Sequence, residues 1–269
     1  MNLAVCFFGK VGGKKGKDEV GGKNDPSESV KEILRYAKAT TDNVDVFIHS
    51  WSEDDKDNLI KICKPKLYKF QEQIRFNTKY SDYPLSEACF LGDSAEESFD
   101  AMVSDLVFRS KSRWYSQAKS LELMQIYSND NNKQYDMVLQ VRLDLIFITN
   151  PFPISYSMDK LYLAYKKKTR EKRREDLYFI SGQEIALKFQ DISNSYDKYH
   201  IDPPCALLQF IQNNKIDCIE RLEMSKDFYL PRWVPSKKRR IFVFLLKKIR
   251  MYSIAIVVRN FFSFILTRK

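Results

Sequence analysis

The sequence predicts an α/β fold with a mixed, mostly parallel sheet flanked by helices. Residues 2–8 and 43–49 are short apolar runs, and a helical pattern that starts at Pro26 lies between them. A strand, a helix and a second strand in this order form a βαβ unit with parallel strands. Residues 135–147, YDMVLQVRLDLIF, are a nearly continuous apolar run, which is typical of a strand buried on both faces of such a sheet. A chain of 269 residues is long enough to bury a sizeable core.

Hydrophobic periodicity predicts the other elements. In the first helix, Val30, Ile33, Leu34 and Ala37 fall on one face. Further helices are expected over residues 54–62, 96–127 (in two pieces), 183–199 and 205–213, and further strands over 66–76, 160–165, 177–180 and, as the last strand, 215–221. We expect one domain over residues 1–235 and a separate tail over residues 236–269.

The excess of positive charge lies in this tail. Lys and Arg number 45 and Asp and Glu 35, which gives a net charge of +10. Ten of the basic residues and none of the acidic ones lie between 237 and 269, so the remainder of the chain is neutral. Nucleic-acid-binding domains usually carry their basic residues on the folded body. The distribution therefore argues against a nucleic acid as partner and favours an interaction tail.

The tail has the pattern of basic amphipathic helices. Its apolar runs are interrupted by charges, and no uncharged run reaches the roughly 18 residues of a membrane-spanning helix. At 100° per residue, one broad face collects Arg240, Lys247, Lys248, Arg250 and Arg259. This pattern favours helices that lie on an anionic membrane surface. A helical hairpin packed against the body is the alternative.

Cysteine and histidine usage argues against two further classes of site. The five cysteines are odd in number, widely spaced and without a CxxC motif, which is typical of reduced, cytoplasmic thiols. The two histidines, His49 and His200, argue against a His-rich zinc site. The N-terminus has neither a basic segment nor a long apolar segment, so we expect no secretory signal.

A segment rich in glycine and lysine follows the first strand. Residues 9–22 contain six of the eight glycines and four lysines. Glycine lets the backbone approach a ligand closely, and backbone N–H groups can bind phosphate. The spacing matches neither GxGxxG nor GxxxxGK[ST], so a surface loop without a ligand is an equal alternative for the later glycines. Gly9 and Lys10, directly at the strand end, are the candidates.

Polar side chains stand where the predicted strands end, and this edge is where ligands usually bind in α/β sheets. His49 ends the second strand. Arg142 and Asp144 interrupt the central apolar run two residues apart and therefore point to the same side. Because buried charges need a partner, the two residues either form an internal ion pair, or stand at a strand end that reaches solvent, or present a carboxylate and a guanidinium to a ligand. On the predicted helix over 96–127, one face collects Arg113, Ser116 and Lys119.

Four segments carry a resemblance to a known family, whereas motifs such as GxSxG and HExxH do not occur. LAVCFFGK, DVFIHSW, RWYSQAKSLELM and KQYDMVLQVRLDLIF together resemble bacterial capsule and lipopolysaccharide glycosyltransferases with a GT-A-like (Rossmann-type) fold. The resemblance extends over residues 1–220 through short motifs. DLYFISGQEIALKF is similar to a later segment of that family, near the acceptor pocket.

The resemblance implies roles for the candidate residues. Asp144 would be the last carboxylate of a DxD motif, which holds a Mg²⁺ or Mn²⁺ ion or the ribose and diphosphate of the donor. Arg142 stands where the first Asp is expected, and because a guanidinium can bind a diphosphate itself, metal dependence stays open. Asp176 is the candidate for acceptor binding or for the general base, with Asp202 as the alternative. The residues implied near the nucleotide sugar are Gly9, Lys10, His49, Arg113, Ser116, Lys119 and Arg142.

These features predict a nucleotide-sugar-dependent glycosyltransferase that acts on a surface polysaccharide or a lipid-linked glycan acceptor. Its tail would hold it peripherally on the cytoplasmic face of the plasma membrane. One alternative is a non-catalytic, membrane-associated scaffold with a degenerate transferase fold, which the arginine in the DxD position keeps open. The other is an enzyme of nucleotide or phosphate transfer, against which the missing P-loop argues.

Overall fold

The computed structural model describes residues 1–11, 26–76, 96–165, 174–224 and 226–230, and for residues 96–106 it describes the backbone alone. The strands are β1 (Leu3–Gly9), β2 (Val44–Ser50), β3 (Leu67–Phe70), β4 (Met137–Arg142), β5 (Ile146–Phe147), β6 (Lys160–Tyr165), β7 (Tyr178–Ser181), β8 (Asp217–Glu223) and β9 (Phe228–Tyr229). The helices are α1 (Pro26–Thr40), η1 (Glu53–Asp55), α2 (Lys56–Cys63), α3 (Glu96–Asp130), α4 (Gln183–Lys188), α5 (Gln190–Asn194), η3 (Tyr196–Lys198) and α6 (Pro203–Asn213).

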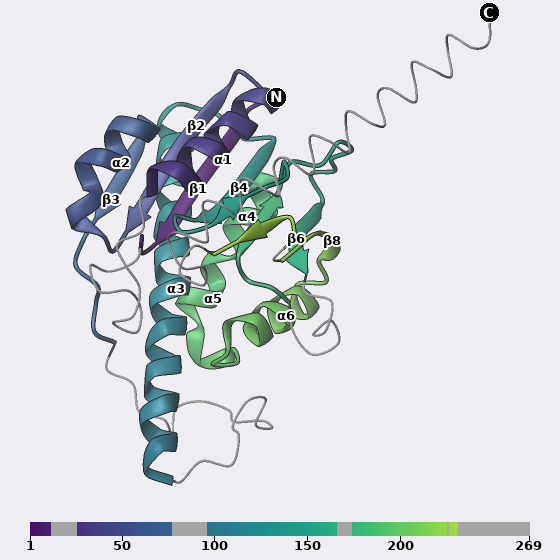
Figure 1. Ribbon diagram of the computed structural model, residues 1–269. Helices are drawn as coiled ribbons and strands as arrows, with labels where there is room; N and C mark the ends of the chain where they lie inside the picture. The colour runs from purple at the N-terminus through teal and green to yellow at the C-terminus, as the bar shows by residue number, and fades with distance from the viewer. Residues whose placement is uncertain (12–25, 77–95, 166–173, 225, 231–269) are drawn as a thin grey trace, which may run out of the picture.

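Seven strands form one sheet in the order β3-β2-β1-β4-β7-β6-β8, and β5 and β9 form a small second sheet. The strand β1 pairs in parallel with β2 and β4, and β2 pairs in parallel with β3. On the other side of β4, β7 is antiparallel to both of its neighbours, whereas β6 and β8 are parallel. Helices cover both faces of the sheet (Figure 1). The predicted α/β class, with a mixed and mostly parallel sheet flanked by helices, is confirmed.

Side chains along the central strands alternate between two apolar layers. Leu3, Val5 and Phe7 of β1 belong to the layer that packs with α1, whereas Ala4 and Cys6 belong to the layer that packs with α3. All five are fully buried. Burial on both faces is why β1 and the first half of β4 consist almost entirely of apolar residues.

The helix α3 is the longest element and runs along the sheet in the direction opposite to β1 and β2. Ser116 lies at the carboxyl end of β2, where its hydroxyl donates to the His49 carbonyl oxygen at 3.3 Å. Further along the helix, the ring of Tyr127 packs on Phe47 with the ring centres 5.7 Å apart. The first half of α3 projects beyond the edge at which β1 and β2 end (Figure 1).

Several predicted boundaries were wrong. The run 135–147 is a strand only to Arg142, after which a turn leads into β5, and the strand expected over 66–76 ends at Phe70. The helix expected in two pieces over 96–127 is continuous through Asp130, because no Gly or Pro interrupts it. The single helix expected over 183–199 is instead α4, α5 and η3, and β9 follows the strand expected to be the last.

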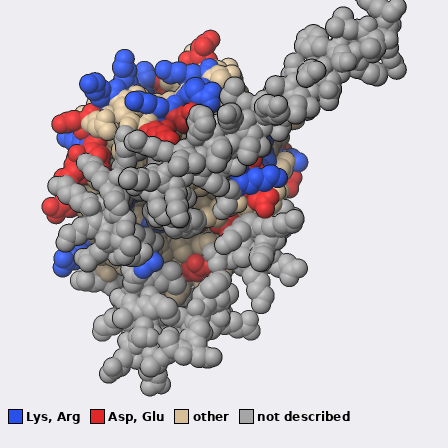
Figure 2. Space-filling model, viewed as in Figure 1, with Lys and Arg blue, Asp and Glu red and all other residues tan. Residues whose placement is uncertain are grey.

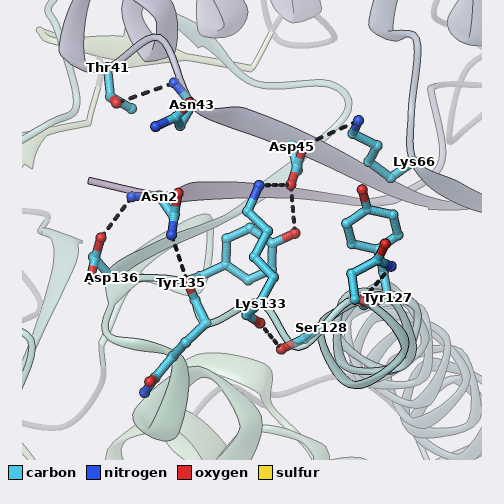
Figure 3. Close-up of polar contacts among 12 residues, drawn as sticks. Asn2, Thr41, Asn43, Asp45, Lys66, Tyr127, Ser128, Lys133, Tyr135 and Asp136 are labelled. Atoms are coloured by element: carbon cyan, nitrogen blue, oxygen red, sulfur yellow. Dashed lines mark hydrogen bonds and ion pairs between the residues drawn. The ribbon is translucent and has the colours of Figure 1, made fainter.

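At the edge where the parallel strands begin, Asp45 of β2 binds three side chains (Figure 3). The Lys133 ammonium lies 2.5 Å from Asp45 Oδ2, and the Tyr135 hydroxyl donates to the same oxygen at 2.8 Å. Lys66 Nζ lies 3.7 Å from Oδ1. Because Asp45 is buried, these partners offset the cost of removing its charge from water. The contacts hold β2 against the segments that precede β3 and β4.

Basic and acidic side chains are interspersed over the part of the visible face formed by α1 and α2 (Figure 2). Among the described residues, no helix is both long enough and apolar enough to span a membrane. The predicted tail over residues 236–269 and the glycines that follow Gly9 lie outside the described residues, so both stay predictions.

Candidate functional site

The carboxyl ends of β1, β2 and β4 meet at one edge of the sheet, beside the middle of α3. In the parallel register, Gly9 of β1 lies opposite Ser50, and Phe8 lies opposite both His49 and Arg142. The start of β7 reaches the same edge, because β7 is antiparallel to β4 and Tyr178 pairs with Val141. The predicted site residues on or next to these elements are therefore brought together, although they come from five separate parts of the chain.

Ser116 of α3 joins the ends of β1 and β2. The Gly9 N–H donates to Ser116 Oγ at 2.8 Å, and His49 Nδ1 lies 2.7 Å from the same oxygen. Gly9 has a φ of +96°, a conformation that favours glycine. The Gly9 N–H already donates to Ser116 and is therefore not available to a ligand. What Gly9 can contribute is close approach of a ligand to the backbone, because it has no side chain.

His49 is fully buried, and its ring is packed between aromatic side chains. The ring centres of His49 and Trp51 are 4.8 Å apart, and Trp51 stacks on Tyr115 at 5.4 Å. Burial, helped by the positive charges of Lys69 and Lys119, lowers the pKa of His49 to about 3. The imidazole is therefore neutral at physiological pH. The ring packs at the end of β2, and without a charge it cannot form an ion pair with a ligand.

Arg113 of α3 and Asp176, just before β7, form a buried ion pair at this edge. Arg113 Nε donates to Asp176 Oδ2 at 2.6 Å, and Nη2 donates to the Asp176 carbonyl oxygen. The two side chains are 8% and 13% exposed. Burial lowers the pKa of Arg113 to about 10, and the Asp176 carboxylate opposes this change. Among the described contacts, none ends on Asp176 Oδ1, so this oxygen can accept a further hydrogen bond.

Two buried glutamines extend the Arg113 contacts into the core. Arg113 Nη1 donates to Gln117 Oε1, and Gln117 Nε2 donates to Gln140 Oε1 on β4. An arginine has donors only, which fixes the direction of both hydrogen bonds. The Gln140 Nε2 group at the end of this chain is buried and has no partner among the described residues. All three nitrogens of Arg113 are thus engaged.

Arg142 and Asp144 form a second ion pair at the same edge. Arg142 Nε and Nη2 donate to the two oxygens of Asp144, each at 2.8 Å. The turn that carries Asp144 is fixed because Leu143 N–H donates to Phe8 O at 3.2 Å and Ser29 Oγ donates to Leu143 O at 2.6 Å. Burial would lower the pKa of Arg142, but the charge of Asp144 outweighs it and raises the pKa.

Of the sequence interpretations of this pair, the ion pair is confirmed, and a ligand role stays a prediction. The two ion pairs also act on each other, since Arg142 lowers the pKa of Arg113 and Asp176 contributes to the raised pKa of Arg142. Two guanidinium groups and two carboxylates thus form one compact group of alternating charges. Removing any one partner of such a group would leave a buried charge unpaired.

The other predicted residues lie near this group or away from it. Lys10 is exposed directly after β1. Lys119 pairs with Glu122 on α3, and its ammonium is 5.7 Å from the centre of the Tyr115 ring. Asp202 precedes α6, where its Oδ2 accepts a hydrogen bond from the Cys205 thiol at 3.3 Å. Asp176, in contact with Arg113, is thus better placed than Asp202 for a role at this edge.

The side chains around Asp144 do not form a divalent cation site by themselves. Both carboxylate oxygens already accept from a guanidinium, and the described residues contain no group of three His, Cys, Asp or Glu side chains placed to hold a metal ion. Protein sites for Mg²⁺ and Mn²⁺ are built from carboxylate and other oxygen ligands that are available to the ion. We therefore derive no chemical step through a metal.

Sequence reasoning missed Tyr115, Gln117 and Gln140. Gln140 carried a signal, because it is an uncharged polar residue inside an apolar strand, and such a residue needs a buried partner. Gln117 lies four positions after Arg113, the spacing at which helical side chains meet. No local signal identified the stacking of Tyr115 on Trp51.

No protein-family model matches the sequence, and no curated protein matches it. Among solved structures, a nucleoside-diphosphate-sugar pyrophosphorylase from Vibrio cholerae is similar over 90% of this chain and 99% of its own, at 10% identity and a TM-score of 0.45. A glycosyltransferase involved in the glycosylation of the major capsid of PBCV-1 is similar over 92% and 100%, at 6% identity and a TM-score of 0.38. An inositol-1-phosphate CTP transferase from T. maritima is similar over 92% and 96%, at 11% identity and a TM-score of 0.41. At these values the likenesses concern the course of the chain, and they carry no argument about activity.

Proposed function

We propose that this protein is a glycosyltransferase that moves a sugar from a nucleotide-sugar donor to a surface polysaccharide or a lipid-linked glycan acceptor. The observation that carries the proposal is the group of alternating charges, Arg113, Asp176, Arg142 and Asp144, at the carboxyl edge of a mostly parallel sheet. This edge is the general ligand position in α/β folds. A guanidinium beside it suits the diphosphate of a nucleotide sugar.

The residues divide between donor and acceptor. Arg142 faces the diphosphate, and Gly9 lets the nucleotide approach the end of β1. Asp176 acts as the general base, because its Oδ2 is held by Arg113 while Oδ1 remains open to a proton. In the transfer, the bond between the anomeric carbon and the phosphate oxygen breaks. The acceptor hydroxyl oxygen bonds to that carbon, its proton passes to Asp176, and the nucleoside diphosphate leaves.

A panel of nucleotide sugars tests this function on the full chain, with isolated polysaccharide or lipid-linked oligosaccharide as acceptor. We expect acceptor-dependent release of a nucleoside diphosphate, together with a glycosylated product. The variant Asp176→Asn should reduce turnover by at least about 100-fold, the scale for a lost general base. The matched variant Asp217→Asn, an exposed residue on β8, should retain activity. Wild-type turnover by Asp176→Asn would reject the assignment of the base.

The same assay separates the alternative functions by their products. Nucleotidyl transfer from a nucleoside triphosphate and a sugar phosphate releases pyrophosphate, whereas glycosyl transfer releases a nucleoside diphosphate. A scaffold releases neither. The engagement of both carboxylates in ion pairs is the observation that favours a scaffold.

For its location, we propose peripheral binding to the cytoplasmic face of the plasma membrane through the basic tail, where lipid-linked acceptors are assembled. Ten Lys and Arg without any Asp or Glu over residues 237–269 support attraction to anionic lipids. Sedimentation with anionic vesicles, compared between the full chain and a chain ending at residue 236, measures this contribution. Equal sedimentation of the two chains would reject the tail as the membrane-binding segment.

A further inference from the structure

The two ion pairs at the carboxyl edge differ in how their guanidinium groups are used. Arg142 gives one N–H from Nε and one from Nη2 to Asp144. A guanidinium has five N–H donors, so three of those on Arg142 have no partner among the described residues. Arg113, in contrast, engages all three of its nitrogens. Arg142 is therefore the guanidinium that is available to a ligand.

The two side chains of the Arg142–Asp144 pair differ in how deeply they are buried. The Asp144 side chain is 4% exposed, whereas the Arg142 side chain is 19% exposed. The carboxylate is thus the more deeply buried partner, and the guanidinium is the part of the pair that solvent reaches. A ligand that arrives at the end of β4 meets the guanidinium first, and Asp144 holds that group in a fixed orientation from behind. A planar fork with remaining N–H groups is suited to bind two phosphate oxygens at once.

A divalent cation at the same place would meet an unfavourable environment. It would have to bind oxygens that already accept from Arg142, and it would lie beside a permanently charged guanidinium. The charge that a divalent cation normally brings to a diphosphate is instead already built into the chain.

We propose that the site binds a nucleoside diphosphate without a divalent cation, with the guanidinium of Arg142, oriented by Asp144, in the place of the metal. This inference rests on the proposed function, because it concerns the donor of that reaction. It assigns Asp144 a positioning role, in which the carboxylate acts on the ligand through Arg142. Asp144 is then not a ligand of a metal ion.

Calorimetric titration of UDP, GDP, CDP and ADP into the full chain tests the inference, once in buffer with EDTA and once with excess Mn²⁺. We expect at least one of these nucleotides to bind in EDTA with the same affinity as in Mn²⁺. The variant Arg142→Gln should weaken binding in EDTA on the order of 10–100-fold, the scale for lost charge-assisted hydrogen bonds. Arg142→Lys keeps the charge but not the fork, so it should bind with an intermediate affinity.

A matched control is available on α1. Arg35 forms the same forked pair with Glu32, with Nε and Nη2 donating at 3.2 and 2.9 Å, and its side chain is 60% exposed. Arg35→Gln should therefore leave nucleotide binding unchanged, and circular dichroism should show that all variants are folded. If Arg142→Gln does not fold, Arg142→Lys and the comparison of EDTA with Mn²⁺ on the wild-type chain decide the question.

Two outcomes would overturn the inference while the proposed function stands. One is nucleotide binding that requires Mn²⁺ and disappears in EDTA. The other is unchanged affinity of Arg142→Gln in EDTA. If no nucleoside diphosphate binds in either buffer, the donor site itself is refuted, and the proposed function fails together with the inference.

Discussion

Arg113 Nε and Asp176 Oδ2 lie 2.6 Å apart, although the two residues are 63 positions apart in the chain. Arg113 belongs to the helix that covers the parallel strands, and Asp176 leads into the antiparallel strand β7. The pair therefore joins the two halves of the sheet at the edge that carries the candidate site. Since the Asp176 carbonyl oxygen accepts a second hydrogen bond from Arg113, the backbone before β7 is fixed together with its carboxylate.

Removing Arg113 should destabilise the whole domain. Arg113→Ala leaves the buried Asp176 carboxylate without its partner and Gln117 without its donor. We expect the free energy of unfolding to fall by about 3–5 kcal/mol, the range for breaking one side of a buried pair. Urea denaturation followed by circular dichroism measures this loss.

The double variant Arg113→Met with Asp176→Leu serves as its control, because it removes both charges at once. It should recover a large part of the lost stability, since a buried ion pair is often replaceable by apolar residues of similar size. Activity should not recover, because Asp176 is then missing. A double variant as unstable as Arg113→Ala would contradict this account of the pair.

His49 makes stability depend on pH in the acidic range. Its pKa is about 3 in the folded chain against 6.5 for an unperturbed histidine, so the unfolded chain binds one more proton between these values. The stabilising effect is complete above pH 6.5 and is lost as the pH falls towards 3. The slope should reach about 1.4 kcal/mol per pH unit.

Urea unfolding at a series of pH values measures this slope in the wild type and in His49→Asn, in which the slope should decrease. Carboxylates that titrate in the same range are common to both chains and cancel in the comparison. His200→Asn is the second control, because it shows how much of the pH dependence comes from the other histidine. His200 is half-buried, and burial lowers its pKa as well. An identical pH dependence of wild type and His49→Asn would show that His49 is not the group responsible.

Two glycines should respond to alanine for different reasons. Gly9 has a φ of +96° and open space where a Cβ would stand, so Gly9→Ala should cost about 1–2 kcal/mol through backbone strain alone. At Gly182, a Cβ would lie 2.5 Å from the Met158 carbonyl oxygen, so Gly182→Ala must displace backbone.

Thermal and urea unfolding of both variants measure these costs, and nucleotide binding separates the two sites. Binding should change in Gly9→Ala, since Gly9 lies at the candidate site, but not in folded Gly182→Ala. A weaker response of binding to Gly9→Ala than to Gly182→Ala would place the nucleotide away from the end of β1.

The sequence was sufficient to predict the parts of this fold that depend on local patterns. Short apolar runs made β1 and β2 recognisable, and the apolar face with Val30 and Ile33 identified α1. The turn after Arg142 was missed because Leu143, Leu145 and their neighbours are as apolar as the strand itself. Side-chain period alone does not show where such a run leaves the sheet.

The candidate site was predictable at strand ends and unpredictable across the sheet. His49 and Arg142 could be placed at one edge, because parallel strands end on the same side. The contact of Asp176 with Arg113 could not be predicted, because it depends on β7 pairing with β4 in the antiparallel sense. Gln140 shows a third case, in which the residue is noticeable in the sequence but its partner comes from a distant helix.

The Asp45 cluster should contribute to stability without contributing to the candidate site. Asp45→Ala removes the common partner of Lys133 and Tyr135 at the edge opposite to Arg142, and it leaves the buried Tyr135 hydroxyl without an acceptor (Figure 3). We expect the free energy of unfolding to fall by about 3 kcal/mol, measured by urea denaturation. Asp45→Asn should cost less, because its amide oxygen can still accept from Tyr135. At temperatures where both variants are folded, nucleotide affinity should equal that of the wild type. A loss of affinity in the folded variants would show that the two edges of the sheet are coupled, contrary to the separation of binding and stabilising residues inferred from their positions.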